Sequence, residues 1–309
     1  MTDLRFPVSP APALAASGAR TLGSLGPVGP LALGCWRLTG DHNDNIRLVE
    51  TALDLGMNLV DNADVYGLDW GGTHFGACEE ELGAILRERP GLRDRMVLAT
   101  KGGIIPGVPY DSSAAYVESA CEASLRRLGV DHVDLYQIHR PDMLTHPHEL
   151  ADALSSLRQR GLVREIGVSN YTVAQTRALQ RFTGAPLVST QPEFSAACLD
   201  PMRDGTFDLC METSLTPLAW SPLAGGRLAT GNGIDDRLIS TLDRIASEKS
   251  STRVAVALAF VLAHPARPVA LVGTQSPGRL AGLAQATEIA LTRTEMYDIV
   301  QASEGRPLP

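Results

Sequence analysis

Short apolar runs alternate with longer amphipathic segments along most of the chain. The runs are typical of buried strands and predict strands at 31–35, 57–60, 96–100, 133–138, 163–169, 187–191, 215–220 and 269–272. The segments between them have helical periodicity and predict helices at 45–55, 78–87, 110–128, 148–160, 173–182, 234–247, 252–264 and from 277 onward. Strands and helices that alternate eight times, without a linker or a change of composition, predict a single (β/α)8 barrel of the α/β class.

The two ends of the chain predict additions to this barrel. Residues 21–28 contain Gly23 and Gly26-Pro27 and predict a β-hairpin that caps one end of the barrel, and an extra helix is expected at the C-terminus. Residues 1–20 are rich in Ala and Pro and predict a flexible arm, which leaves 21–309 as the barrel domain. A doubly wound open sheet is the alternative, but it usually has a GxGxxG turn after the first strand, and this sequence has none there.

Polar residues that could take part in catalysis follow three successive predicted strands. Asp61, Lys101 and His139 each come directly after a strand, and their spacing suits successive βα units. Tyr66 follows Asp61 in a loop that Gly67 closes. Because the carboxyl ends of parallel strands meet at one rim of a barrel, we expect these four side chains to lie close together.

Lys101 is unusual in a chain that uses arginine for almost every positive charge. The sequence has 25 Arg and only two Lys, which are Lys101 and Lys249. Arginine does not release its proton in proteins, whereas an ammonium is a compact charge whose pKa responds to its surroundings. A lysine at a strand end therefore indicates a position that arginine would not serve.

Composition excludes several classes of function. The net charge of −8 argues against a nucleic-acid partner, and the longest late apolar run, 254–263, is too short to span a membrane. Five scattered cysteines without a CxxC pair indicate reduced thiols in a cytoplasmic protein. His146 and His148 lie at a helix start without nearby Cys or Glu ligands, so we expect no metal site.

In this order and context, Asp61, Tyr66, Lys101 and His139 resemble the catalytic tetrad of the aldo-keto reductases. The resemblance runs from about residue 22 to the C-terminus and includes the segments 124–131, 167–171, 191–193 and 220–223. One difference lies after the tyrosine, where the glutamate and the Leu-Gly of compact members come later here, as Glu79 and Leu82-Gly83. Residues 68–77 thus resemble an insertion beside the substrate pocket.

The four residues divide the work of carbonyl reduction. Tyr66 is the candidate proton donor, but a free phenol with a pKa of about 10 is a weak acid at neutral pH. The ammonium of Lys101 is expected to lower the pKa of Tyr66, and Asp61 to hold Lys101 charged. His139 is expected to donate a hydrogen bond to the carbonyl oxygen.

The resemblance also implies a nicotinamide cofactor across the rim. Ser169, Asn170 and Gln191 match positions that hold the carboxamide, and Trp220 matches an aromatic residue that stacks on the nicotinamide ring. The loop over the pyrophosphate is matched by Ser221, Leu223, Gly225 and Arg227, and the adenosine-phosphate segment by Gly273, Thr274 and Arg279. Thr274 and Arg279 predict binding of a 2′-phosphate and therefore NADPH. NAD stays possible, because many relatives have a lysine where Gly273 stands.

The sequence leaves the substrate open beyond an aldehyde or ketone that is reduced to an alcohol. Trp36 and Trp70 are candidate walls of the pocket, and no arginine stands in an obvious place to demand a carboxylated substrate. A cofactor-binding regulatory, redox-sensing subunit with the same fold is the first alternative to an enzyme. A lyase that forms a Schiff base through Lys101 is the second. No feature of the sequence predicts the oligomeric state.

Overall fold

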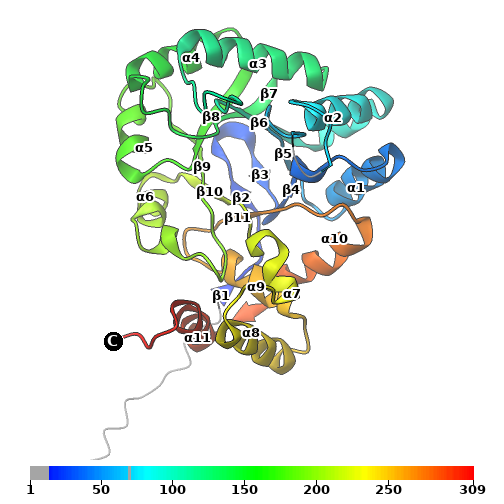
Figure 1. The fold of residues 1–309 in the computed structure, drawn as a ribbon, viewed down its shortest axis with the longest axis vertical. Coiled ribbons are helices and arrows are strands. Elements are labelled where there is room, and N and C mark those ends of the chain that lie inside the picture. The colour runs from blue at the N-terminus through cyan, green and yellow to red at the C-terminus, as the bar shows by residue number, and fades with distance from the viewer. Residues whose placement is uncertain (1–13, 69–70) are drawn as a thin grey trace, which may run out of the picture.

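Eight parallel strands form a closed barrel at the centre of the molecule (Figure 1). The structure, a computed structural model, describes residues 14–68 and 71–309. The barrel strands follow one another in chain order: β4 (Leu31–Gly34), β5 (Leu59–Asp61), β6 (Val97–Gly102), β7 (Val133–Ile138), β8 (Val163–Ser169), β9 (Ser189–Gln191), β10 (Thr216–Ala219) and β11 (Val269–Val272). The ring closes where Ala270 of β11 pairs with Leu31 of β4.

Helices surround this barrel, so the predicted (β/α)8 architecture is confirmed (Figure 1). They are α1 (His42–Asp54), α2 (Ala77–Glu88), α3 (Ala114–Leu128), α4 (Pro147–Gln159), α5 (Val173–Gln180), α6 (Thr206–Thr213), α7 (Arg227–Thr230), α8 (Asp236–Glu248), α9 (Arg253–Leu262), α10 (Pro277–Ala284) and the extra C-terminal helix α11 (Arg293–Glu304). Short 3-10 helices lie at Gly23–Leu25, Cys35–Arg37, Pro90–Arg95, Asp200–Met202, Ala224–Gly226 and Gln285–Glu288.

Local sequence sets several helix ends. The Ser113 side chain accepts a hydrogen bond from the Tyr116 amide and caps α3, as the run of Ser and Asp before this helix predicts. Thr172 and Gln175 form a reciprocal capping box at the start of α5. These caps satisfy amide groups that have no partner inside the helix.

The interior of the barrel is closed at one end by the predicted hairpin. Strands β2 (Arg20–Thr21) and β3 (Pro27–Val28) pair antiparallel. Leu22, which directly follows β2, and Val28 of β3 belong to the apolar cluster inside the barrel. The same cluster contains Val97 and Val269, the first residues of β6 and β11. The hairpin therefore covers the amino ends of the strands, and the carboxyl ends form the opposite rim.

The start of the described chain packs against the C-terminal region. Strand β1 (Leu14–Ala15) pairs with β12 (Ala290–Leu291). Residues 1–13 lie outside the described residues, so the predicted boundary between arm and barrel at residue 20 stays a prediction. Arg20, inside the expected arm, is 2% exposed and hydrogen-bonds main-chain carbonyls.

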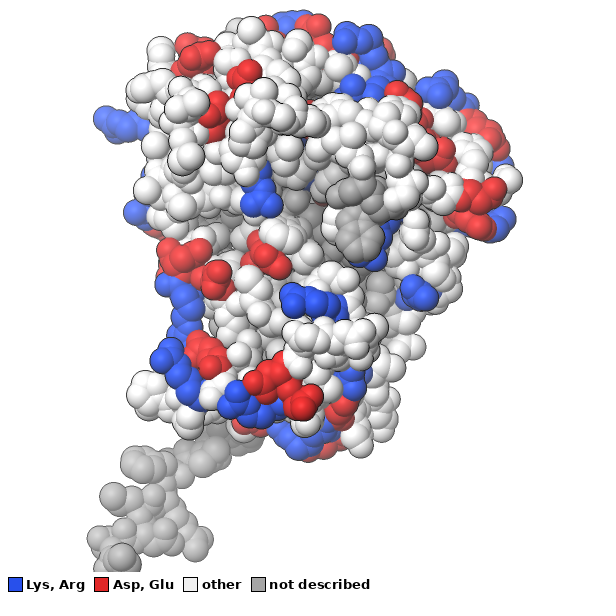
Figure 2. All heavy atoms as spheres, viewed as in Figure 1, with Lys and Arg blue, Asp and Glu red and all other residues white. Residues whose placement is uncertain are grey.

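Two features of the described residues, 14–68 and 71–309, bear on possible partners. None of the helices in these ranges has the length and apolar composition needed to cross a bilayer. Acidic and basic side chains are interspersed on the face shown in Figure 2 and do not form one large basic patch there.

Candidate active site

Asp61, Tyr66, Lys101 and His139 lie together at the carboxyl ends of β5, β6 and β7. The Lys101 ammonium donates to Asp61 Oδ2 at 2.5 Å and to the Asn62 carbonyl at 2.8 Å. Its Nζ lies 5.0 Å from the centroid of the Tyr66 ring. The rings of Tyr66 and His139 meet edge to face, with centroids 5.8 Å apart. The rim thus holds the four side chains in one cluster.

The ion pair between Lys101 and Asp61 is buried and fully partnered. Lys101 is 0% exposed and Asp61 is 1% exposed. The second carboxylate oxygen of Asp61 accepts hydrogen bonds from Gln137 Nε2 at 3.2 Å and Gln191 Nε2 at 3.1 Å. A buried charge pair is tolerated when its remaining lone pairs are satisfied in this way. Asp61 therefore fixes the position of the ammonium.

Burial and nearby charges set the protonation states of the cluster. Burial alone would lower the pKa of Lys101, but Asp61 and Tyr66 outweigh it and the pKa is raised. Burial raises the pKa of Tyr66 to about 12, and the charge of Lys101 opposes this only in part. Lys101 thus acts in the expected direction, but burial outweighs it and the net shift of the Tyr66 pKa is upward. Burial, followed by the charges of Lys101 and Arg140, holds the pKa of His139 well below its usual range.

A cavity of about 1500 Å³ opens above the tetrad. Asp61, Tyr66 and His139 line it, whereas the fully buried Lys101 lies behind them. Trp36 also lines it, and Trp70 lies outside the described residues. Every residue that the sequence assigns to the cofactor lines the same cavity: Ser169, Asn170, Gln191, Trp220, Ser221, Leu223, Gly225, Arg227, Gly273, Thr274 and Arg279.

Hydrogen bonds connect the residues expected at the nicotinamide end. Asn170, in the left-handed region with φ 59°, donates to the His139 carbonyl at 3.2 Å and to Ser169 Oγ at 2.8 Å. Its side-chain oxygen accepts from Trp220 Nε1 at 3.0 Å. Ser169 Oγ donates to the Gln191 carbonyl at 3.0 Å. The ring of Trp220 is therefore held in a fixed orientation relative to the tetrad.

The other end of the cavity has the features of a phosphate site. Gly225 and Gly226 have φ values of 69° and 96° in the loop after β10, a conformation that glycine adopts without strain. Helix α10 begins at Pro277, and no side chain caps its N-terminus. Free amide groups at a helix start attract anions. Thr274 and Arg279 lie on either side of this helix start and line the cavity.

Two arginines that the sequence reasoning did not assign to the site also line the cavity. The Arg140 guanidinium carbon lies 5.9 Å from the Trp220 ring centroid, and that of Arg37 lies 5.4 Å from the Trp36 ring centroid. Figure 2 shows basic side chains beside the hollow in the middle of this face. The sequence offered no arginine in an obvious place to demand a carboxylated substrate, and the structure adds these two to the cavity lining. The sequence could have indicated both arginines by their position, because Arg140 directly follows the candidate His139 and Arg37 directly follows the candidate Trp36.

A sequence profile described as the Aldo/keto reductase family matches residues 30–304. The chain belongs to this family. A 6-dehydroglucose reductase from Novosphingobium aromaticivorans is 44% identical over 295 residues, which cover 94% of this chain and 97% of that protein. A 6-dehydroglucose reductase from Agrobacterium fabrum is 34% identical over 290 residues, which cover 89% of this chain and 94% of that protein.

Solved structures of the family show the same architecture. An aldo/keto reductase from Klebsiella pneumoniae in complex with NADP and acetate has a TM-score of 0.77 and 27% sequence identity, and the match covers 95% of this chain and 96% of that one. NADP(H) is the cofactor of the family. The residues of this aldo/keto reductase fit it, because an uncapped helix start, a glycine-rich loop and Arg279 line one end of the cavity.

Proposed function

We propose that this aldo/keto reductase uses NADPH to reduce the aldehyde group of a small, hydroxyl-rich molecule to a primary alcohol. The observation that carries the proposal is the cluster of Tyr66, His139 and the Lys101–Asp61 pair beneath the cavity. When bound, NADPH supplies the hydride that reduces the carbonyl carbon.

The protein supplies the proton and the hydrogen bonds. With a pKa of about 12, Tyr66 is protonated at neutral pH and can donate its proton to the carbonyl oxygen. The adjacent positive charge of Lys101 stabilises the phenolate that remains. His139 is a neutral imidazole at this pH, so one ring N–H is available to orient the carbonyl oxygen.

Two observations support a hydroxyl-rich substrate. Arg140 brings guanidinium donors to the cavity beside Trp220, and Arg37 brings them beside Trp36. Planar guanidinium groups present several N–H donors and suit polar ligands with more than one oxygen. Both curated relatives described above are named 6-dehydroglucose reductases, and this name describes a sugar with an aldehyde at one end.

The geometry disfavours a Schiff-base lyase. A lysine that attacks a carbonyl must reach it as a free amine. Lys101 is 0% exposed, lies behind the residues that line the cavity, and has a raised pKa that keeps it protonated. No observation favours a regulatory subunit, and a subunit that only binds the cofactor would not need Tyr66 and Lys101 in this arrangement.

An absorbance assay of NADPH consumption tests the proposal. We expect turnover with 6-dehydroglucose and glyceraldehyde, and much weaker turnover with an apolar aldehyde such as benzaldehyde. Tyr66→Phe should lower turnover at least about a hundredfold, because it removes the general acid, and should leave NADPH binding nearly unchanged. The matched control is Tyr297→Phe, which removes an exposed hydroxyl on α11 and should have no effect.

The possible outcomes separate the parts of the proposal. Unchanged turnover in Tyr66→Phe would contradict the role of Tyr66 as the acid. A preference for benzaldehyde over the hydroxylated aldehydes would contradict the substrate class and leave the reductase assignment in place.

A further inference from the structure

A second group of buried polar side chains lies behind the tetrad and has no role in the reaction described above. Asp64, Glu79 and Tyr136 are each 0% exposed. Asp64 lies in the short loop between Asp61 and Tyr66, and Tyr136 belongs to β7, the strand that ends just before His139. Asp64 and Tyr136 therefore come from the elements that position the tetrad, and Glu79 comes from helix α2.

Of the two buried acids in this group, only Glu79 pairs with a guanidinium. Arg127 Nε and Nη2 each lie 2.7 Å from Glu79 Oε2, and Thr100 Oγ1 donates to Glu79 Oε1. Glu79 therefore has its counter-ion. Asp64 has no side-chain hydrogen-bond partner within the described part of the chain, and the one hydrogen bond that favours its ionised form comes from the Val65 backbone. An ionised carboxylate is very costly in such a position, whereas a neutral acid costs much less.

Burial and a neighbouring acid both favour the neutral form of Asp64. Burial raises the pKa of Asp64 well above its usual range, and the negative charge of Glu79 adds to this effect. The positive charge of Arg127, a hydrogen bond with the Val65 backbone and the positive charge of Lys101 oppose it and are outweighed. Tyr116 also faces this carboxyl group, and burial raises its own pKa.

Backbone contacts tie Asp64 to the strand that carries the catalytic lysine. The Asp64 amide donates to the Lys101 carbonyl at 2.9 Å, and the His139 amide donates to the Gly102 carbonyl at 2.9 Å. A Cβ at Gly102 would overlap the Tyr136 hydroxyl and lie 3.2 Å from Asp64 Oδ2. The Asp64 carboxyl and the Tyr136 hydroxyl therefore converge on the glycine beside Lys101.

We propose that Asp64 is a positioning residue that acts as a neutral carboxylic acid and fixes the loop of Tyr66 against the strand of Lys101. Glu79 is the member of the two acids that pairs with Arg127. The catalytic consequence rests on the proposed function, whereas the protonation state of Asp64 does not.

Infrared spectroscopy tests the protonation state without an activity assay. The carbonyl stretch of a protonated carboxylic acid is separate from the bands of a carboxylate. The wild-type spectrum minus the Asp64→Asn spectrum at neutral pH should contain this band. The matched control is Asp243→Asn, which removes an exposed carboxylate that pairs with Arg253, and its difference spectrum should lack the band. A wild-type protein without the Asp64 band would overturn the neutral-acid assignment.

Kinetics test the positioning role. Asn has nearly the shape of a neutral Asp, so Asp64→Asn should keep kcat within about threefold, whereas Asp64→Leu should lower it at least about tenfold with little change in KM for NADPH. If Asp64→Leu does not fold, Asp64→Ser takes its place. Wild-type kcat in the Leu or Ser variant would overturn the positioning role. Equal losses in the Asn and Leu variants would overturn the neutral-acid role, since an isosteric neutral group would then not suffice.

Discussion

Gly273 is the position at which the preference for NADPH can be strengthened. It lies between β11 and α10, next to Thr274, and lines the cavity. A Cβ at this position would have the Gly34 carbonyl oxygen as its nearest neighbour, at an ordinary contact distance of 3.7 Å. Its φ lies outside the left-handed region, so an L side chain enters without strain. Gly273→Lys should therefore bring an ammonium to the 2′-phosphate.

The expected gain follows from an exposed, charged contact. A hydrogen bond to a charged group contributes about 1.5–3 kcal/mol, and fixing a lysine side chain costs up to about 2 kcal/mol. A net gain of about 1 kcal/mol corresponds to roughly fivefold tighter NADPH binding. The loss of glycine flexibility in the unfolded chain adds up to about 1 kcal/mol of stability, but it affects both cofactors equally.

Quenching of the three tryptophans on titration with NADPH and with NADH measures this effect. Gly273→Lys should lower the Kd for NADPH and leave the Kd for NADH unchanged, and added salt should reduce the difference. Gly273→Gln is the control, because it adds a side chain of similar length without the charge. An equal gain for NADH, or an equal gain in the Gln variant, would refute the reasoning.

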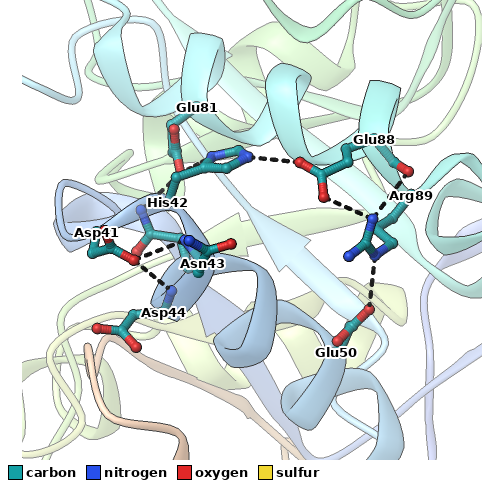
Figure 3. A network of polar contacts seen from close by, with 9 residues as sticks. Asp41, His42, Asn43, Asp44, Glu50, Glu81, Glu88 and Arg89 are labelled. Carbon is teal, nitrogen blue, oxygen red and sulfur yellow. Dashed lines mark hydrogen bonds and ion pairs between the residues drawn. The ribbon is translucent and has the colours of Figure 1, made fainter.

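Two further predictions concern stability. The buried Arg20 guanidinium donates to the carbonyls of Ala16, Ser17, Gly18, Leu262 and Pro268, so Arg20→Met should lower the free energy of unfolding by about 2–3 kcal/mol in urea titrations, and an unchanged midpoint would contradict this. His42 joins α1 to α2 through Glu81 at 2.9 Å and Glu88 at 3.1 Å (Figure 3), and these hydrogen bonds raise its pKa. Because the pKa of His42 is raised in the folded state, its stabilising effect is fully present below about pH 6.5 and is lost as the pH rises through the folded-state pKa. His42→Gln should therefore lower Tm at about pH 5.5 and leave it unchanged at about pH 9. Equal shifts of Tm at both pH values would contradict the second prediction.

The order of strands and helices could be predicted because apolar runs and helical periodicity depend on burial. β8 covers Val163–Ser169, the range that the pattern predicts. α6 (Thr206–Thr213) was not predicted from the pattern. Its Phe207 packs against Phe194 with ring centroids 4.7 Å apart, and this contact joins residues from different elements. Tertiary packing of this kind favours a helix that short-range periodicity does not indicate.

Strand ends were harder to predict than strand positions. The sequence places Asp61 and Lys101 just after their strands, but both belong to them. Asp61 pairs with Gly34 and Ala99, and Lys101 pairs with Gln137. Backbone pairing continues through a charged residue when a neighbouring strand is present. The type of side chain therefore does not indicate where the pairing ends.

The residues that form the site could be predicted from the sequence, but the net direction of their pKa shifts could not. The sequence indicates that Lys101 lies near Tyr66 and that its charge acts to lower the Tyr66 pKa. The net shift is upward, because burial outweighs the charge of Lys101. The extent of burial depends on how the whole rim packs. The same holds for Asp64, whose neutral form follows from the pairing of Glu79 with Arg127.

The resulting arrangement separates the Lys101 ammonium from the cavity in which the proposed reaction takes place. The charged groups, Lys101 and Asp61, form a pair whose ammonium is fully buried, and the proton donors that face the cavity, Tyr66 and His139, are neutral. Positive charge behind a neutral donor stabilises negative charge that develops on the carbonyl oxygen. It also keeps the amine of Lys101 away from an aldehyde that would otherwise form a Schiff base with it. In the proposed reduction of an aldehyde, burial of Lys101 behind Tyr66 therefore stabilises the developing charge and also prevents inactivation of the lysine by the substrate.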